Sequence, residues 1–286
     1  MPWIIACAVV LAAVIIYLAL VWPAPRKHPD RGIMEGQYIA HRGLHNASEG
    51  IPENSLRAFE KAAEAGFIIE NDIHLTRDGQ VIVFHDDDLM RMCGDARAPE
   101  DVTLEEIRKL RLLGTEHGIP TLAECLDTVA GRVPLLIEFK LGKGNCEELC
   151  RAADSILSEY GGKYMIQSFY PQVPRWYRKN RPGIMRGQLA TVLKGQGFAK
   201  RLLGTLVENV ASRPDFVSFD RGHKNYFPRR IAAFLGAFSA GWTFRSIDEI
   251  KADRGDFKAF IFENITPEEI KDHEEGNRFE GGRRRA

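Results

Sequence analysis

Eight short apolar runs, separated by helical or loop segments, constrain the fold of this chain more than any other feature. Strands that alternate with helices form parallel sheets, and eight such units are the number that closes a barrel. Roughly 250 residues follow Gln37, a length that fits one barrel of this kind. The sequence therefore predicts an α/β fold, a (β/α)8 TIM barrel, with strands near 37–41, 67–73, 134–139, 164–168, 184–189, 215–219, 236–243 and 258–262.

Between these runs the sequence predicts helices and one hairpin. A helix is expected from about Asn54 to Ala65, because its apolar residues recur at helical spacing and Gly66 can end it. Further helices are expected at 104–112 and 121–130. The stretch 77–85 combines a tight-turn composition with a second extended run, so we expect a hairpin that passes over the barrel mouth.

The first 23 residues form a separate apolar segment. No charged side chain occurs between Trp3 and Trp22, and about 20 residues at about 1.5 Å each cover the hydrocarbon core of a bilayer. The two tryptophans lie at the ends of the segment, where indoles favour the membrane interface. A secretory signal peptide is the alternative, but it would have a basic leader and a small-residue cleavage site. We therefore predict a transmembrane helix over 1–23.

A short basic stretch follows this segment. Residues 24–36 read as a tether that carries Arg26, Lys27 and Arg31. By the positive-inside rule these charges place the rest of the chain in the cytoplasm, as a single-pass protein of the cell membrane. The cysteines are odd in number and show no metal-site spacing, so we interpret them as free thiols in a reducing compartment: Cys7, Cys93, Cys125, Cys146 and Cys150.

Charge is balanced over the whole chain, with 39 basic and 39 acidic residues. Because there is no basic stripe, a nucleic acid is not the expected partner. Residues 273–286 have almost no apolar content, which predicts a disordered tail after a folded domain at 37–272. Nothing in the pattern indicates an oligomeric state.

The first polar signature is His41-Arg42-Gly43, which directly follows the first predicted strand. Histidine is the side chain best suited to move protons near neutral pH. A guanidinium offers planar, paired donors that fit phosphate oxygens, and a glycine lets the backbone turn or a ligand approach closely. Such a tripeptide alone is usually a solvated loop, so its meaning depends on the residues near it.

The second signature runs from Glu70 to Asp86. Strand periodicity places Glu70 and Asp72 on one face, where the two acids repel each other unless a cation lies between them. The predicted hairpin then carries His85 back toward these carboxylates. Oxygen ligands of this kind suit Mg²⁺, Ca²⁺ or Mn²⁺ better than zinc.

A third element adds Glu138 and Lys140 on one face of a later apolar strand. Together the three elements supply what hydrolysis of a phosphate diester needs: a proton acceptor, a proton donor and positive charge at the phosphate oxygens. The predicted strands all end at the face on which barrels carry their chemistry, so these distant residues should meet in one pocket.

These stretches resemble the glycerophosphodiester phosphodiesterases, and the match extends from Gln37 to Ile265. The matching stretches are Ile39-Ala40-His41-Arg42-Gly43, Pro52-Glu53-Asn54-Ser55, Glu70-Asn71-Asp72 with Thr76-Arg77-Asp78-Gly79, Val83-Phe84-His85-Asp86, Ile119-Pro120-Thr121-Leu122, Ile137-Glu138-Phe139-Lys140, Gln167-Ser168-Phe169 and Gly241-Trp242-Thr243.

The resemblance implies a role for each position that matches the family pattern. His41 and His85 would be the catalytic proton-transfer pair, and Arg42 and Lys140 would bind the substrate phosphate. A divalent cation, Mg²⁺ or Ca²⁺ with Mn²⁺ as a further candidate, would be held by the metal ligands Glu70, Asp72 and Glu138. Glu53 matches a residue of the site mouth, and Trp242, at the end of a late strand, is a candidate pocket residue.

The chain departs from the family pattern in places. The stretch 91–94 lacks a threonine often found after the second histidine, and Asn54-Ser55 replaces Asn-Thr. Glu263-Asn264 stands where relatives tend to have Thr-Asp. We expect this last change to lie on the barrel rim, away from the proposed catalytic residues, and to affect substrate detail. His45 and His74 are expected to be supporting or structural, and His28, His117 and His223 to be solvated.

The sequence thus predicts a metal-dependent hydrolase that cleaves glycerophosphodiesters to glycerol 3-phosphate and an alcohol by two-histidine acid–base catalysis. Two alternatives use the same features. One is a membrane-tethered lysophospholipase D-like enzyme, whose substrate keeps an acyl chain. The other is a non-catalytic membrane protein that binds phospholipid headgroups. A zinc amidohydrolase-like barrel fits less well, because the first strand does not end in His-x-His.

Overall fold

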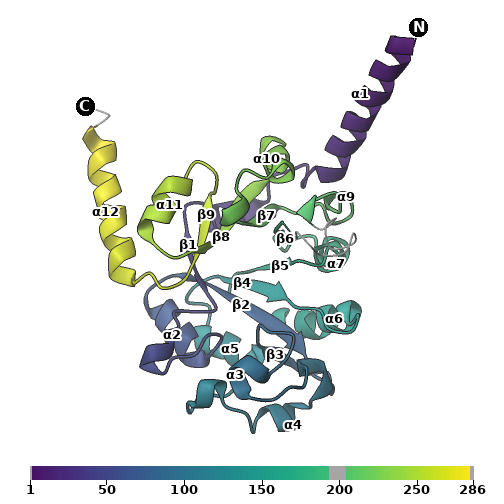
Figure 1. Cartoon of the computed structure of the whole chain (residues 1–286). Coiled ribbons are helices and arrows are strands. Elements are labelled where there is room, and N and C mark those ends of the chain that lie inside the picture. Colours follow the sequence, from purple (N-terminus) through teal and green to yellow (C-terminus); the bar gives the residue numbers. More distant parts are fainter. Residues whose placement is uncertain (1, 193–203, 284–286) are drawn as a thin grey trace.

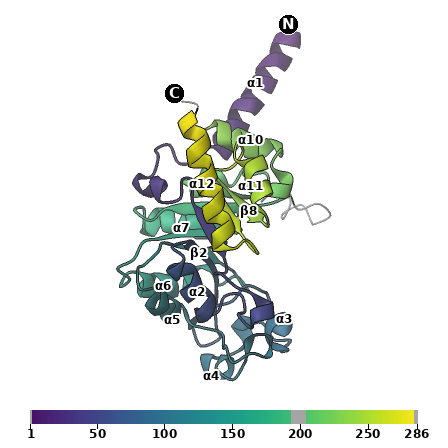
Figure 2. The same ribbon diagram turned by 90° about the vertical axis from the view of Figure 1, so that its left-hand side faces the viewer.

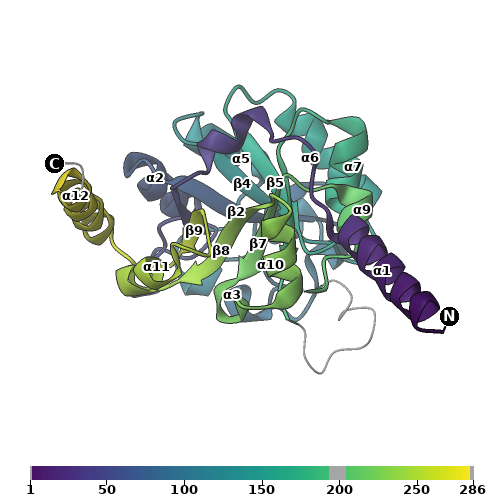
Figure 3. The same ribbon diagram turned by 90° about the horizontal axis from the view of Figure 1, so that it is seen from above.

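Eight parallel strands close into a barrel in the computed structural model, which describes residues 2–192 and 204–283, the side chains to residue 275. The strand order is β1-β9-β8-β7-β6-β5-β4-β2, and a β1–β2 pairing closes the circle. The predicted TIM barrel is confirmed (Figures 1 and 3). The barrel strands are β1 (Tyr38–His41), β2 (Ile68–Leu75), β4 (Leu135–Phe139), β5 (Tyr164–Ser168), β6 (Arg186–Ala190), β7 (Phe216–Asp220), β8 (Phe238–Phe244) and β9 (Ala259–Phe262).

Helices surround the sheet and connect its strands (Figure 3). They are α1 (Pro2–Val21), α2 (Leu56–Glu64), α3 (Met90–Cys93), α4 (Leu104–Ile107), α5 (Leu122–Val129), α6 (Cys146–Leu157), α7 (Gln172–Asn180), α9 (Asn209–Ser212), α10 (Phe227–Phe234), α11 (Ile247–Asp253) and α12 (Pro267–Arg283). Short 3-10 turns are η1 (Pro29–Ile33), η2 (Ala47–Glu49), η3 (Pro99–Asp101), η4 (Leu112–Gly114) and η5 (Arg221–His223).

The core has two layers because strand side chains alternate between the two faces of the sheet. One apolar cluster fills the barrel, and it includes Ile39, Ile68 and Leu136. A larger cluster lies between the outer face of the sheet and the helices. Side chains two residues apart in a strand share a face. The inward residues that come two positions after Ile39, Ile68 and Leu136 therefore form the floor of the site.

The stretch after β2 forms an insertion with its own small core. Strand β3 (Val81–Val83) pairs antiparallel with the second half of β2, which confirms the predicted hairpin. The predicted helix at 104–112 is wrong in length, because α4 ends at Ile107. A capping box between Thr103 and Glu106 starts this helix, and the chain then turns through η4, where Leu113 has a φ of 52°. The insertion core is built from residues of several turns and strands and not from one face of a helix. Its buried apolar residues are Ile82, Phe84, Leu89, Met92, Val102, Ile107, Leu112 and Ile119.

The N-terminal helix α1 is long and apolar enough to cross a membrane, a test that signal sequences near an N-terminus also meet. Its last turn is part of the fold. The Val21 side chain is buried in the core, Asn209 Nδ2 donates to Val21 O at 3.0 Å, and Arg213 Nη1 donates to Ala19 O at 3.1 Å and Trp22 O at 2.8 Å.

Residues 24–36 were predicted as a tether, and the structure packs them against the barrel. Ala24 N donates to Pro214 O at 2.9 Å, and Gly36 N donates to Lys258 O at 2.7 Å. Met34 is fully buried in the cluster that fills the barrel. The segment therefore covers the N-terminal end of the barrel and connects α1 to it without a free linker.

The predicted disordered tail is wrong for residues 273–283, which continue α12, while residues 284–286 lie outside the described part of the chain. A reciprocal cap starts this helix, because Thr266 N donates to Glu269 Oε2 at 2.8 Å and Glu269 N donates to Thr266 Oγ1 at 3.2 Å. Pro267 at the first helical position and the charged, straight-chain residues that follow favour the helix even without apolar content.

Candidate active site

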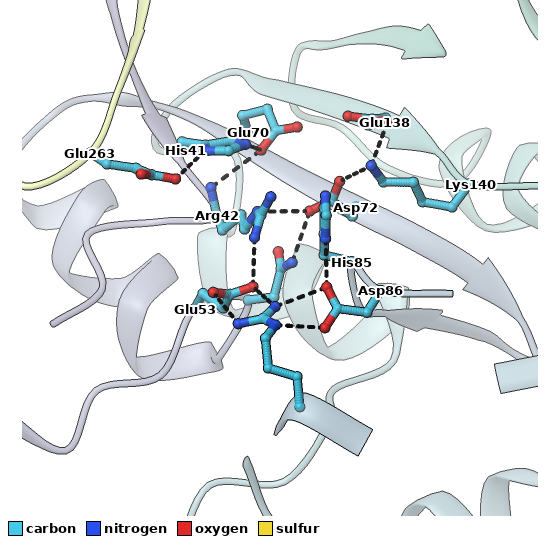
Figure 4. A network of polar contacts seen from close by, with 12 residues as sticks. His41, Arg42, Glu53, Glu70, Asp72, His85, Asp86, Glu138, Lys140 and Glu263 are labelled. Carbon is cyan, nitrogen blue, oxygen red and sulfur yellow. Dashed lines mark hydrogen bonds and ion pairs between the residues drawn. The ribbon is translucent and has the colours of Figure 1, made fainter. Parts of the chain in front are cut away.

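Four of the predicted site residues, His41, Glu70, Asp72 and Glu138, come from three neighbouring strands. His41 follows the buried Ile39 by two residues in β1, Glu70 follows Ile68 in β2, and Glu138 follows Leu136 in β4. The register pairs His41 with Glu70 and Asp72 with Glu138. The parallel sheet thus gathers residues that are far apart in the sequence, as predicted (Figure 4).

Three carboxylates form one buried cluster. Glu70, Asp72 and Glu138 each offer an oxygen within 4.8 Å of the others, and none is more than 4% exposed. Asn54 Nδ2 donates to Asp72 Oδ2 at 2.9 Å, and Gln167 Nε2 reaches Glu70 Oε1 at 3.4 Å. An all-oxygen set of this kind fits a hard divalent cation.

Two basic side chains lie against these acids. Lys140 Nζ is 2.5 Å from Glu138 Oε1 and 3.1 Å from Asp72 Oδ1. Arg42 donates its backbone N–H to Glu70 Oε2 at 3.2 Å, and its Nε lies 3.5 Å from Asp72 Oδ2. Both cations have raised pKa values: burial lowers them, but the surrounding carboxylates, Asp72 first, outweigh that effect.

The three carboxyl groups of the cluster differ in the direction of their pKa shifts. Burial raises the pKa of Glu138 to about 7, which Lys140 opposes and Asp72 reinforces. Burial, then the charges of Asp72 and Glu138, raises the pKa of Glu70 well above its usual range. Burial would also raise the pKa of Asp72, but the charges of Lys140, His85 and Arg42 lower it. Burial and mutual repulsion therefore oppose the ionisation of Glu70 and Glu138, and a divalent cation is the partner that would let all three acids ionise.

Gly43 has the conformational role expected of it. Arg42 and Gly43 have φ values of 56° and 82°, so the chain turns sharply after β1. A Cβ on Gly43 would lie 2.8 Å from the backbone C of Ala58 in α2. Only glycine fits this close approach, which holds the Arg42 backbone N–H against Glu70.

Glu263 is a site residue that the sequence analysis placed wrongly on the rim. Its Oε1 lies 2.6 Å from His41 Nδ1, and its Oε2 accepts from Arg245 Nη2 at 3.1 Å. Burial would raise the pKa of Glu263, but the hydrogen bond and charge of His41 lower it to about 2. The departure from the family pattern therefore contacts a proposed catalytic residue. Glu263 directly follows β9, and β9 pairs with β1 in the closed barrel. That pairing would have indicated that Glu263 lies beside His41.

His85 lies in a second acid–base chain (Figure 4). Its Nδ1 is 2.7 Å from Asp86 Oδ1, and burial lowers the pKa of the imidazole. Arg91 binds Asp86 with its Nε at 2.6 Å and binds both oxygens of Glu53. Glu53 in turn accepts from Arg42 Nη1 at 2.7 Å. Arg91 and Asp86 were not predicted as site residues, and no periodic signal marks them.

Both histidines, Arg42, Lys140, Glu70, Glu138 and Glu263 line one open cavity of about 420 Å³. Trp242 lines it as predicted, and its ring meets that of Phe169 edge-on with centroids 5.9 Å apart. Leu189 and Ile261 also line it. The lining therefore combines charged groups suited to phosphate with apolar groups suited to a carbon chain or glycerol backbone.

The other histidines lie outside this cavity. His74 is buried, with Nδ1 2.9 Å from Glu100 Oε1, which agrees with a structural role. His28 Nδ1 accepts from Asp30 N at 3.2 Å, and His223 Nδ1 lies 3.1 Å from Asp220 Oδ2, so neither is simply solvated. Burial lowers the pKa of His45, which lines a neighbouring pocket. All five cysteines are free thiols.

Comparison with known proteins agrees with this geometry. Residues 41–190 match the model of the glycerophosphoryl diester phosphodiesterase family. A glycerophosphodiester phosphodiesterase of Caldanaerobacter subterraneus subsp. tengcongensis is 35% identical over 171 residues, which cover 54% of this chain and 67% of the relative. Mouse glycerophosphodiester phosphodiesterase 1 is 34% identical over 147 residues, covering 47% of this chain and 43% of the relative.

Solved structures show the same fold. An Oleispira antarctica phosphodiesterase, solved in complex with the product sn-glycerol-3-phosphate, superposes with a TM-score of 0.68 at 22% identity and covers 83% of this chain and 96% of its own. A Thermotoga maritima glycerophosphodiester phosphodiesterase superposes with a TM-score of 0.61 at 23% identity, covering 79% and 93%. The family match contains the three acids, both proposed catalytic histidines and both phosphate-binding candidates, whereas Trp242 and Glu263 lie beyond it.

Proposed function

This chain belongs to the glycerophosphoryl diester phosphodiesterase family, and from its site we propose that it hydrolyses glycerophosphodiesters to glycerol 3-phosphate and an alcohol. The observation that carries the proposal is one cavity lined by two histidines, two cations and two members of the buried carboxylate cluster, Glu70 and Glu138, with Asp72 directly behind them. A phosphate-binding protein without catalysis would not need two imidazoles, each paired with its own acid.

The two histidines divide the proton transfers. One imidazole accepts the proton of the attacking hydroxyl as its oxygen bonds to phosphorus, and the other donates a proton to the departing alkoxide as the P–O bond breaks. Glu263 holds His41 through Nδ1, and Asp86 holds His85 in the same way, so each Nε2 is left to face the cavity. The attacking oxygen is either water or the neighbouring glycerol hydroxyl, which would give a cyclic phosphate that water then opens.

Arg42 and Lys140 bind the phosphate in this proposal. Both line the cavity and both stay charged, since nearby carboxylates raise their pKa values. Positive charge fixed beside the non-bridging oxygens stabilises the negative charge that builds there in the transition state.

Glu70, Asp72 and Glu138 would hold a divalent cation, Mg²⁺, Ca²⁺ or Mn²⁺. Bound there, it would supply positive charge to polarise the phosphate and to lower the pKa of a hydroxyl. The cluster fits such an ion, because the three acids offer oxygens within 4.8 Å of one another and burial raises the pKa values of Glu70 and Glu138 in its absence.

The test is turnover of glycerophosphocholine by the full chain in detergent, with release of glycerol 3-phosphate and choline measured separately. Chelation with EDTA should abolish turnover, and re-addition of each cation in turn identifies the one used. Absence of turnover of glycerophosphocholine with every cation would overturn the proposal and leave the lysophospholipase D-like activity and headgroup binding as the alternatives.

A second candidate is a lysophospholipase D-like activity on a substrate that retains one acyl chain. The apolar lining residues Trp242, Phe169 and Leu189 and the apolar helix α1 favour it. We place α1 in the cell membrane as a single-pass anchor with the barrel in the cytoplasm, on the basis of the basic residues that follow it. Turnover of lysophosphatidylcholine relative to glycerophosphocholine decides between the two substrates.

A further inference from the structure

Helix α10 carries an exposed face of unusual composition. Phe227 and Phe234 are 63% and 86% exposed, and Arg230 between them is exposed as well. Residues spaced by three and then four positions share one side of a helix. The opposite side of α10 is buried through Pro228, Arg229 and Ala232, so the helix packs normally on the barrel and turns two aromatic rings outward. We call Phe227, Arg230 and Phe234 the α10 face.

The α10 face lies beside the base of the apolar helix α1. The rings of Tyr17 in α1 and Phe227 stack with centroids 6.3 Å apart. Trp22, 45% exposed, directly follows the same helix, and Val210, 39% exposed, lies in α9, whose Asn209 binds the last turn of α1. Both side views place α10 on the side of the barrel from which α1 leaves (Figures 1 and 2). Exposed apolar residues grouped in this way mark an interaction site.

The direction of α1 relative to the α10 face is fixed by contacts. Arg213 binds two carbonyl groups at the end of α1, Val21 is buried in the core, and residues 24–36 are packed on the barrel. A bilayer entered by α1 therefore meets the same side of the barrel each time, and the α10 face is on that side.

We propose that the α10 face rests in the headgroup region of the bilayer that α1 enters, and that it seats the barrel on the membrane. This inference rests on the membrane placement of α1 proposed above and not on the reaction. Aromatic rings favour the interface between water and lipid. Arg230, with the exposed Arg26 and Lys27 just beyond α1, suits anionic headgroups. The consequence is that the barrel is held against the lipid surface and does not hang from a flexible tether.

The experiment uses the full chain in nanodiscs with lipids brominated along the acyl chains, which quench nearby tryptophans. Phe234→Trp places a reporter on the α10 face, and Leu113→Trp is the matched control. Leu113 is 46% exposed in η4, which follows α4 in the insertion, and Figure 1 shows α4 on the side of the barrel away from α1. Neither position touches the cavity. Of the four native tryptophans, Trp3 and Trp22 lie at the two ends of α1, so the fraction of native emission that is quenched reports insertion of α1 in every variant.

The expected result is that the emission added by Phe234→Trp is quenched, whereas the emission added by Leu113→Trp is not. Quenching of the native tryptophans without quenching of Phe234→Trp would overturn the proposal, as would a Phe234→Trp emission that is blue-shifted but unquenched, because protein would then cover the face. Unquenched native tryptophans would remove α1 from the membrane and overturn it too. Turnover of glycerophosphocholine by the same samples separates any of these results from a failure of the proposed reaction.

Discussion

The carboxylate of Glu263 lies 2.6 Å from Nδ1 of His41, so the residue that follows the last barrel strand orients the histidine that ends the first. This contact exists because β9 pairs with β1 where the barrel closes. It gives His41 a fixed imidazole orientation with Nε2 3.8 Å from Glu70, at the edge of the carboxylate cluster.

Replacement of Glu263 should therefore impair catalysis more than binding. Glu263→Gln removes the negative charge beside the imidazole, and we expect kcat for glycerophosphocholine to fall by up to about a hundred-fold while KM changes little. Glu268→Gln is the matched control, since Glu268 is exposed on the same segment. Steady-state kinetics with both variants checks this, and an equal loss in both would show that Glu263 has no specific role.

Loss of either proposed catalytic imidazole should abolish most turnover. His41→Ala and His85→Ala are each expected to lower kcat by about a hundred- to ten-thousand-fold, the usual contribution of a general acid or base. His117→Ala is the control, because His117 lies outside the cavity. Circular dichroism confirms that the variants fold, and full activity in either single variant contradicts the two-histidine mechanism.

We expect Arg91 to support catalysis indirectly, by holding Glu53 and Asp86 in place. It binds Glu53 and Asp86 at once, and Arg91→Lys cannot make both paired contacts. We expect a several-fold loss of kcat, because Asp86 then positions His85 less well. Arg97→Lys is a close control: Arg97 is similarly exposed, 45% against 48%, and pairs with Asp95 and Glu106 outside the site. Equal kinetics for the two variants would contradict this role.

The carboxylate cluster predicts a pH-dependent stability in the absence of metal. Burial raises the pKa of Glu138 to about 7, above its unfolded value of 4.5. Such a group stabilises the fold fully below the unfolded pKa, and this stabilisation is lost as the pH rises through the folded pKa. In EDTA, the Tm of the wild type should therefore fall relative to that of Glu138→Gln between about pH 5 and pH 8.

Addition of a divalent cation should reverse this difference, with a larger gain in wild-type Tm at the higher pH because protons no longer compete for the carboxylates. Thermal unfolding of both proteins at each pH, with and without the cation, is the measurement. A Tm difference that does not change with pH would contradict the raised pKa of Glu138.

Gly43 should not tolerate a side chain. Gly43→Ala meets the backbone of Ala58 at 2.8 Å as well as a positive φ, whereas Gly50, with a φ of 71°, has open space around it. We expect Gly50→Ala to lower the free energy of unfolding by about 1–2 kcal/mol, the cost of the left-handed backbone alone. Gly43→Ala should cost clearly more and should also lower turnover, since Arg42 is displaced. Urea unfolding of both variants checks this.

Much of the fold could be predicted because it depends on local periodicity. All eight barrel strands lie within a few residues of the apolar runs, and His41, Glu70 and Glu138 could be placed together because parallel strands end on one face. The helix at 104–112 could not be predicted in length, since its leucines pack into a small irregular core and do not follow one helix face.

Contacts between distant segments were the harder part. Glu263 could have been placed beside His41 only by reasoning that a closed barrel brings its last strand to its first. The packing of residues 24–36 depends on tertiary hydrogen bonds to the barrel, and composition gave no sign of it. Arg91 reaches Glu53 and Asp86 from a four-residue helix whose direction no pattern encodes.

Barrel closure by β9 also has a consequence for biosynthesis. Helix α1, β1 and the first partner of β1, β2, leave the ribosome early in translation, whereas β9, the second partner of β1, arrives only near the end. A chain truncated before residue 259 would lack both the closing strand and the carboxylate that orients His41. Incomplete products would therefore remain inert, and hydrolytic competence would begin only when synthesis is finished.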